Sequence, residues 1–98
     1  MDLTSKIVVI TGGGGGWGQT VVEAFLNANA SVVVIERPRV VEDIEIWKQR
    51  KLGERSSRLS CVAGDVLNEA SVERMMQQVL DQHGRLDVLV NIVGGFTM

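Results

Sequence analysis

Short runs of apolar and β-branched residues alternate along the chain with longer stretches in which apolar residues recur every three or four positions. Runs of the first kind predict buried strands over residues 7–11, 32–35, 59–66 and 86–93. Stretches of the second kind predict helices over residues 17–29, 40–52 and 68–84. Because strands and helices alternate throughout, the pattern predicts a parallel sheet that is covered by helices.

Residues suited to helix ends and turns mark the borders of these segments. Asn68 is a good N-cap for the third helix, and Gly84 is a good stop for it. Asn29 can adopt the left-handed conformation at the end of the first helix. Pro38 predicts the end of the second strand, and Gly53 the end of the second helix.

The strands are continuous apolar runs rather than alternating ones, which indicates burial on both faces. The fold class that follows is α/β, a Rossmann-like doubly wound parallel sheet truncated to four strands, with the order 3-2-1-4 and three helices. A chain of 98 residues provides one hydrophobic core, so residues 1–98 are predicted to form a single, partial domain. The apolar face of the third helix is predicted to consist of Val72, Met75, Met76, Val79 and Leu80.

Composition narrows the possible functions. Ten basic and twelve acidic residues give a net charge of −2 without a basic block, so nucleic acid is not an expected partner. The apolar run near the N-terminus is too short to be the core of a signal peptide. The sequence also has no apolar run of 18 residues that would predict a membrane span. The expected location is therefore cytoplasmic. The sequence has no Tyr, one His and one Cys, which excludes a disulfide framework or a Cys/His metal cage.

Several residues with chemical potential have simpler structural interpretations. Cys61 lies in an apolar stretch and is expected to be a buried structural thiol. His83 suits the C-terminal end of a helix, where a cation is favoured by the dipole. Trp47 is expected to pack a peripheral helix. The charges between Glu42 and Arg58 are expected to form a solvated face, although an oligomer contact is an alternative.

The most informative segment is the glycine run that begins at Gly12, continues to Gly16, and is followed by Trp17 and Gly18. It follows a predicted strand and opens a predicted helix, where free backbone N–H groups and the helix dipole form an anion site. Glycine lets the backbone approach a pyrophosphate closely because no Cβ intervenes. The alternative is that the glycines only allow the strand and the helix to pack closely.

Three kinds of phosphate loop compete for this run. The P-loop pattern requires Lys where this chain has Gln19. A methyltransferase loop normally has an acid just before the glycines, where this chain has Ile10 and Thr11. A dinucleotide loop requires an acid about 20 residues on, at the end of the second strand, to bind the ribose hydroxyls. Glu36 occupies that position, 18 residues after Gly18, and therefore favours a dinucleotide.

Thr11, Gly12, Gly16 and Gly18 form the pattern Thr-Gly-x-x-x-Gly-x-Gly, which resembles the short-chain dehydrogenase/reductase family of the classical type. Two further motifs occur in the family's order. Asp65-Val66 resembles the pair that follows the third strand and borders the adenine. The run 91–94 (Asn-Ile-Val-Gly) resembles the Asn-Asn-Ala-Gly motif after the fourth strand. The resemblance covers essentially the whole chain and implies that it is the N-terminal, cofactor-binding part of such an enzyme.

This resemblance implies a set of cofactor-binding residues. Two of them depart from the family pattern: Trp17 replaces an Ile or Leu, and Val93 replaces a smaller Ala beneath the ribose. Asn91 is kept, and its implied role is to tie the fourth strand to its neighbour. The complete set is Gly12, Gly15, Gly16, Trp17, Gly18, Glu36, Asp65, Val66, Asn91, Val93 and Gly94.

The nature of the second strand's end also bears on the choice of cofactor. Glu36 accepts hydrogen bonds from both ribose hydroxyls of NAD but repels the 2′-phosphate of NADP. The position before the middle glycine, where NADP users of the family often carry a basic residue, is Gly15. Arg37 provides a positive charge directly after the strand, either as a phosphate contact or as a solvated loop charge. NAD is therefore expected, with NADP as the less favoured alternative.

The family resemblance implies an oxidoreductase that transfers hydride between NAD(P) and a small-molecule alcohol/carbonyl substrate. The catalytic Ser, Tyr and Lys of the family follow the fourth strand and have no counterparts in this sequence, so we assign no catalytic residue and no metal. The chain is interpreted as a fragment of such an enzyme that is inactive alone. The alternative is a non-catalytic dinucleotide-binding module, either a sensor or a vestige. The family often forms dimers or tetramers, which leaves a homo-oligomer open.

Overall fold

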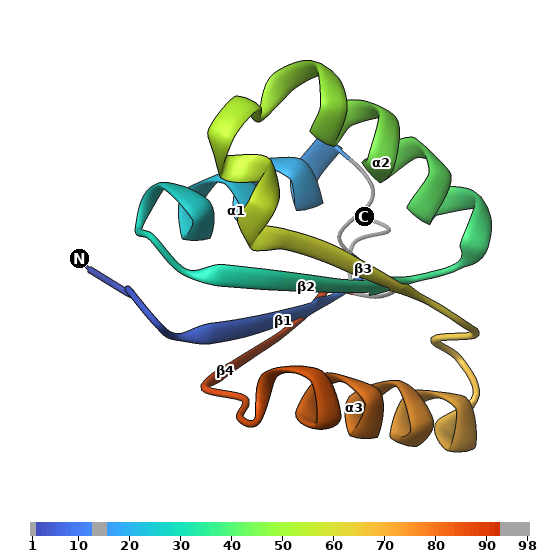
Figure 1. The fold of residues 1–98 in the computed structure, drawn as a ribbon. Helices are drawn as coiled ribbons and strands as arrows, with labels where there is room; N and C mark the ends of the chain where they lie inside the picture. Colours follow the sequence, from blue (N-terminus) through green and yellow to red (C-terminus); the bar gives the residue numbers. More distant parts are fainter. Residues whose placement is uncertain (1, 13–15, 93–98) are drawn as a thin grey trace.

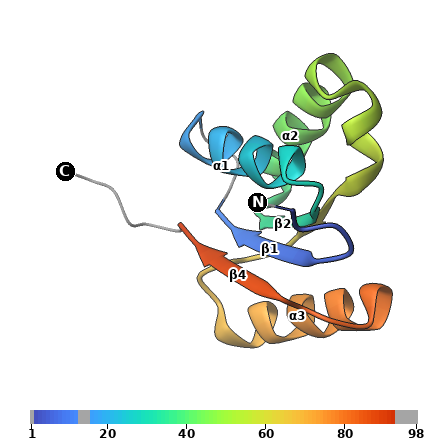
Figure 2. The same cartoon turned by 90° about the vertical axis from the view of Figure 1, so that its left-hand side faces the viewer.

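A four-stranded parallel sheet with helices on both faces forms the body of the molecule. The computed structural model describes residues 2–12 and 16–92. The strand order is β3-β2-β1-β4, which confirms the fold class expected from the sequence. Helices α1 and α2 cover one face of the sheet and α3 covers the other (Figures 1 and 2). The elements are β1 (Ile7–Thr11), α1 (Gly16–Asn27), β2 (Ser31–Glu36), α2 (Pro38–Lys51), the 3₁₀ helix η1 (Gly53–Arg58), β3 (Leu59–Ala63), α3 (Glu69–His83) and β4 (Val88–Asn91).

The two inner strands are buried along their whole length. Every residue of β1 and every residue of β2 after Ser31 is buried, because side chains on both faces meet a helix layer. The side chains of β1 that alternate along the strand enter two separate clusters. Val8 and Ile10 pack beneath α1 and α2, whereas Ile7 and Val9 pack against α3. The sheet therefore has a core on each side, as its continuous apolar runs indicate.

From β1 to β3 the chain adds each strand on the same side of the one before it. The connection after β3 then crosses back over β2 and β1, so that β4 pairs with the other side of β1. Asp87 joins the amino ends of these two strands, because its Oδ2 accepts a hydrogen bond of 2.8 Å from the Ile7 N–H. Hydrogen bonds from Arg85 and from the Ile7 N–H lower the pKa of the Asp87 carboxyl below its usual range. Both interactions favour the carboxylate that holds β4 in register with β1.

The local signals at the segment borders are confirmed. The Asn68 side chain accepts a hydrogen bond of 2.9 Å from the Ser71 N–H at the start of α3. Gly84 ends that helix in the left-handed conformation, with φ of 77°. Asn29 has φ of 72° after α1. Among the residues described, no helix combines the length and apolar content that crossing a membrane requires.

Other borders differ from the expectation. Helix α2 begins at Pro38 rather than at residue 40, because proline is tolerated at the first helical position, where no N–H is needed. Gly53 does end α2, but it also begins η1, which the sequence did not predict. Strands β3 and β4 are shorter than the expected ranges 59–66 and 86–93.

Helix α3 buries only part of its predicted apolar face. Met75 and Val79 are buried against the sheet, whereas Leu80 is 41% exposed. Leu89, on the neighbouring strand β4, is 54% exposed. Strand β4 forms one edge of the sheet, and no further strand is described beside it within residues 2–12 and 16–92.

Gly64 allows the turn after β3 to pass close to α3. A Cβ at this position would collide with the Met75 sulfur and lie 2.9 Å from Met75 Cε and 3.2 Å from Ser71 Oγ. We expect Gly64→Ala to lower the free energy of unfolding by about 1 kcal/mol, at the low end for overpacking, because the nearest atoms belong to the flexible end of the Met75 side chain, which can shift. Urea denaturation of the variant would measure this loss.

Met75→Ala removes both side-chain atoms that the added Cβ would meet and should reduce the cost of Gly64→Ala in a double-mutant cycle. Gly53→Ala is the matched comparison, because Gly53 has φ of 54° and nothing within 4 Å of the added Cβ. Its cost should be independent of Met75. Equal costs of Gly64→Ala in both backgrounds would refute the proposed collision.

Cys61 is half-buried against the α1/α2 core. Burial raises the pKa of its thiol to about 12, and the charge and hydrogen bond of Glu45 act in the same direction, while Lys48 opposes them. Because only the thiolate reacts, we expect alkylation of the folded chain near pH 8 to be slower than that of the unfolded chain by on the order of 10³. Iodoacetamide labelling followed by mass spectrometry, with and without urea, measures both rates.

Glu45→Gln should raise the folded-state rate, because it removes a negative charge that opposes thiolate formation. Glu42→Gln, at an exposed position on the same helix, is the control and should leave the rate unchanged. A wild-type rate that is equal in the folded and unfolded states would contradict the raised pKa.

Candidate cofactor site

The carboxyl ends of the strands gather most of the residues that the sequence singles out. Thr11 at the end of β1 pairs with Ile35 of β2 on one side and with Asn91 of β4 on the other. Glu36 at the end of β2 pairs with Ala63 of β3. Parallel pairing therefore brings the glycine run, Glu36, the loop after β3 and Asn91 to one edge of the sheet.

The backbone turns sharply after β1. Gly12 has φ of 79°, a left-handed conformation that glycine adopts without a steric penalty. Its N–H donates a hydrogen bond of 3.0 Å to the Ile35 carbonyl, which continues the β1–β2 ladder to the start of the glycine run. Helix α1 then begins at Gly16, and Gly18 in its first turn is buried. Gly15 lies outside the described residues, as does the side chain of Trp17.

Glu36 is a charged side chain that is almost removed from solvent. The residue is 7% exposed, and its Oε1 accepts a hydrogen bond of 2.9 Å from the Arg37 N–H. The Arg37 Nε lies 3.6 Å from the same oxygen, and the Arg37 side chain is 68% exposed. Arg37 is therefore a solvent-exposed charge that also forms an ion pair with Glu36.

The loop after β3 is held by its own hydrogen bonds. Asp65 Oδ1 accepts a hydrogen bond of 2.9 Å from the Leu67 N–H, and the Asp65 N–H donates to Ser71 Oγ over 3.2 Å. The Gly64 N–H donates to the Glu36 carbonyl over 3.0 Å, so the loop starts beside the end of β2. Asp65 is exposed and Val66 is half-buried, which leaves the Asp65 carboxylate at the surface of this edge.

Asn91 ties β4 to β1 at the same edge. The Thr11 hydroxyl donates a hydrogen bond of 3.0 Å to Asn91 Oδ1, and the Ile92 N–H donates to the Thr11 carbonyl over 3.0 Å. The two strands are thus joined by side-chain and backbone bonds at the carboxyl end of β1, which has β2 on one side and β4 on the other. Val93 and Gly94, also expected at the site, lie outside the described residues.

A cavity of about 250 Å³ opens on the α3 side of this edge. Thr11 and Asn91 form its polar wall. Its apolar lining combines Val66, which the sequence assigned to the site, with side chains that the sequence assigned to buried faces of a helix and a strand. Periodicity could not separate the latter from core residues, because it does not say which apolar side chains face a cavity. The apolar lining residues are Val66, Val72, Met76 and Leu89.

The chemical groups at this edge include ones that could hold a nucleotide. A left-handed glycine before a helix lets a phosphate approach the backbone, and a buried carboxylate accepts hydrogen bonds from vicinal hydroxyls. In the described part of the chain, no three His, Cys, Asp or Glu side chains are grouped to hold a metal ion. The donors and acceptors therefore fit the phosphate and ribose of a dinucleotide.

Known proteins resemble this chain in both sequence and fold. A 3beta-hydroxysteroid dehydrogenase 2 of Eggerthella lenta is 33% identical over 92 residues, which are 94% of this chain and 34% of that protein. The 3-ketoacyl-(acyl-carrier-protein) reductase from Brucella melitensis, solved with NADH, is 30% identical with a TM-score of 0.72 over 90% of this chain and 34% of that one. ElxO with NADP bound is 31% identical with a TM-score of 0.76, over 88% of this chain and 34% of its own.

The chain spans about a third of the length of the curated relatives that it matches. The sequence model of the short chain dehydrogenase family matches residues 6–98, which include every strand and helix described above. The resemblance to this family that the sequence indicates is thereby confirmed. With its glycine run, buried acid and strand order together, this chain belongs to the short-chain dehydrogenase family.

Proposed function

We propose that this chain is the dinucleotide-binding part of an oxidoreductase that transfers hydride between a nicotinamide cofactor and an alcohol/carbonyl substrate. The observation that carries the proposal is the position of Glu36. Its buried carboxylate ends the strand adjacent to the one that leads into the glycine run. In dinucleotide-binding folds, an acid at this place accepts hydrogen bonds from the adenine ribose. Packing alone would not favour burying a charged group here.

Each part of the cofactor has a candidate partner among the chain's residues. The pyrophosphate would bind the backbone of the glycine run and the first turn of α1, including Gly12, Gly15, Gly16, Trp17 and Gly18. Glu36 would accept from the ribose hydroxyls. Asp65 and Val66 would border the adenine, and the end of β4 with Asn91, Val93 and Gly94 would form the floor of the site. The hydrogen bonds that fix the Gly64–Ser71 loop and the Thr11–Asn91 contact support this arrangement.

The nicotinamide supplies the hydride chemistry when bound, and the protein binds and orients it. The family resemblance implies that a Ser, a Tyr and a Lys carry out proton transfer at the substrate. Because the sequence contains no Tyr, we expect the 98-residue chain by itself to bind the cofactor without converting substrate. A small-molecule alcohol/carbonyl substrate and a homo-oligomeric assembly are proposed only for a full-length enzyme of this family.

NAD is the proposed cofactor. A 2′-phosphate at the adenine ribose would meet the Glu36 carboxylate in a poorly solvated position, where like charges repel strongly. Arg37 opposes this repulsion only in part, since its guanidinium is already 3.6 Å from Glu36 and largely exposed. The solved relatives include one with NADH and one with NADP, so the family accommodates both, and the proposed preference of this chain rests on Glu36.

Titration of the 98-residue chain with NAD and with NADP, followed by calorimetry, tests the proposal. We expect NAD to bind more tightly than NADP, and weakly, because the chain contributes the adenine and pyrophosphate contacts without a wall for the nicotinamide. Glu36→Gln should lower the affinity for NAD by about ten-fold, which corresponds to the loss of one charge-assisted hydrogen bond. The difference between the affinities for NAD and NADP should become smaller. Glu54→Gln, an exposed charge on η1, is the control and should leave both affinities unchanged.

Tighter binding of NADP than of NAD would refute the role of Glu36. A low-micromolar affinity for NAD would contradict the expectation of a partial site. The absence of binding of either dinucleotide would sink the proposed function itself.

A further inference from the structure

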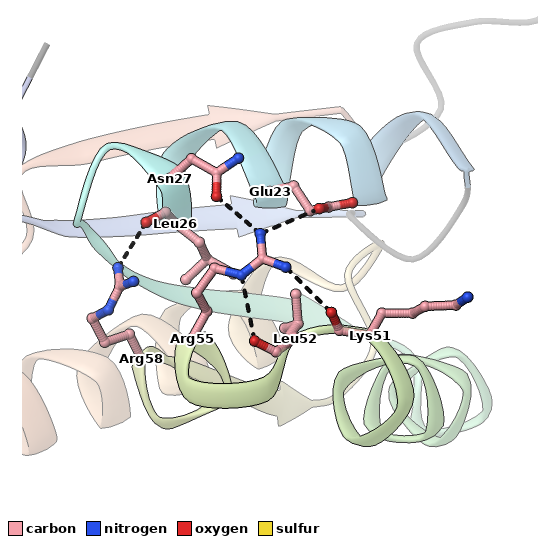
Figure 3. A network of polar contacts seen from close by, with 7 residues as sticks. All are labelled: Glu23, Leu26, Asn27, Lys51, Leu52, Arg55 and Arg58. Atoms are coloured by element: carbon pink, nitrogen blue, oxygen red, sulfur yellow. Dashed lines mark hydrogen bonds and ion pairs between the residues drawn. The ribbon is translucent and has the colours of Figure 1, made fainter.

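The Arg55 side chain contacts both α1 and the end of α2 (Figure 3). Its Nη1 donates a hydrogen bond of 2.9 Å to Asn27 Oδ1 and lies 3.4 Å from Glu23 Oε2, both on α1. The same guanidinium donates to the carbonyls of Lys51, over 3.2 Å, and Leu52, over 3.4 Å, at the end of α2. One side chain of η1 thus connects the C-terminal ends of α1 and α2.

Arg58 contacts the end of α1 through the backbone (Figure 3). Its Nη1 donates hydrogen bonds of 2.8 Å to the Leu26 carbonyl and 2.9 Å to the Ala30 carbonyl. Helix α1 has no basic residue in its own last turn. A cation at a helix C-terminus is favoured by the dipole, so Arg58 supplies from η1 the charge that α1 lacks.

These two arginines act on the same helix that begins at the glycine run. Helix α1 has 12 residues and is therefore a rod of about 18 Å. Val22 and Leu26 are buried against the sheet, so the rod is supported along its second half. The contacts at the C-terminal end therefore help to decide where the first turn lies.

We infer that Arg55 and Arg58 are positioning residues for the phosphate-binding end of α1: by holding the C-terminal end of the helix to η1 and α2, they set the place of its first turn. The inference rests on the proposed function, because the first turn matters only if it binds the pyrophosphate. It assigns a role to two charges that the sequence attributed to a solvated face.

The experiment compares two ligands that differ in their phosphates. ADP uses both the phosphate site and the ribose site, whereas adenosine retains only the base and the ribose that Glu36 contacts. We expect Arg55→Met and Arg58→Met to lower the affinity for ADP by about three- to ten-fold. The affinity for adenosine should stay within about two-fold of the wild-type value. NMR titration of the full 98-residue chain measures both affinities, and its spectra report whether each variant is folded.

Two further variants separate positioning from charge and from helix stability. Arg74→Met removes the same charge from an exposed site on α3, on the opposite face of the sheet, and should leave both affinities unchanged. Asn27→Ala removes an Arg55 contact without altering charge and raises the intrinsic helix propensity. If only helix stability mattered, Asn27→Ala would bind ADP as well as wild type or better; the inference requires weaker binding. This mild variant also serves if an arginine variant fails to fold.

Equal weakening of ADP and adenosine, or unchanged ADP affinity in folded variants, would overturn the positioning role while leaving the proposed function intact. A wild-type chain that binds ADP no better than adenosine would refute the phosphate site, and with it both the proposed function and this inference.

Discussion

The parallel pairing of β1 with two neighbours is the constraint on which the other features depend. β1 lies between β2 and β4, and Thr11 is in register with a residue of each. Because all the strands run the same way, their carboxyl ends meet at one edge, and the loops that follow them share that edge. The edge where the glycine run, Glu36 and Asn91 meet is therefore a property of the sheet order rather than of any single residue.

Helix α1 connects this edge to the rest of the fold. Its first turn follows the glycine run, its middle is buried on the sheet, and its last turn is contacted by Arg55 and Arg58. The helix dipole stabilises an anion at the N-terminus of α1 and a cation at its C-terminus. Contacts far from the proposed phosphate site can thereby bear on that site without touching a ligand.

Local chemistry explains which features were predictable. The strands, the Asn68 cap and the Gly84 stop follow from apolar period and backbone preference, which act over a few residues. The strand order follows from the general rules for connecting parallel strands. The η1 helix and the roles of Arg55 and Arg58 escaped prediction, because a long charged side chain in a polar segment gives no sign of distant carbonyl partners. The exposure of Leu80 and Leu89 was missed for a related reason, since an apolar residue at helix or strand spacing does not say what faces it.

The sequence by itself determined the α/β fold, the family, and the residue types at the proposed dinucleotide site. The reason is that periodicity, turn residues and motif spacing depend only on residue types and their separation along the chain. Only the tertiary structure decided that Glu36 is buried beside an exposed Arg37 and that Thr11 joins Asn91. Likewise, only the packed chain brings η1 against the end of α1, since Arg55 and Asn27 are 28 residues apart in sequence. Such contacts depend on how the layers pack, and packing brings together groups whose separation along the chain carries no signal.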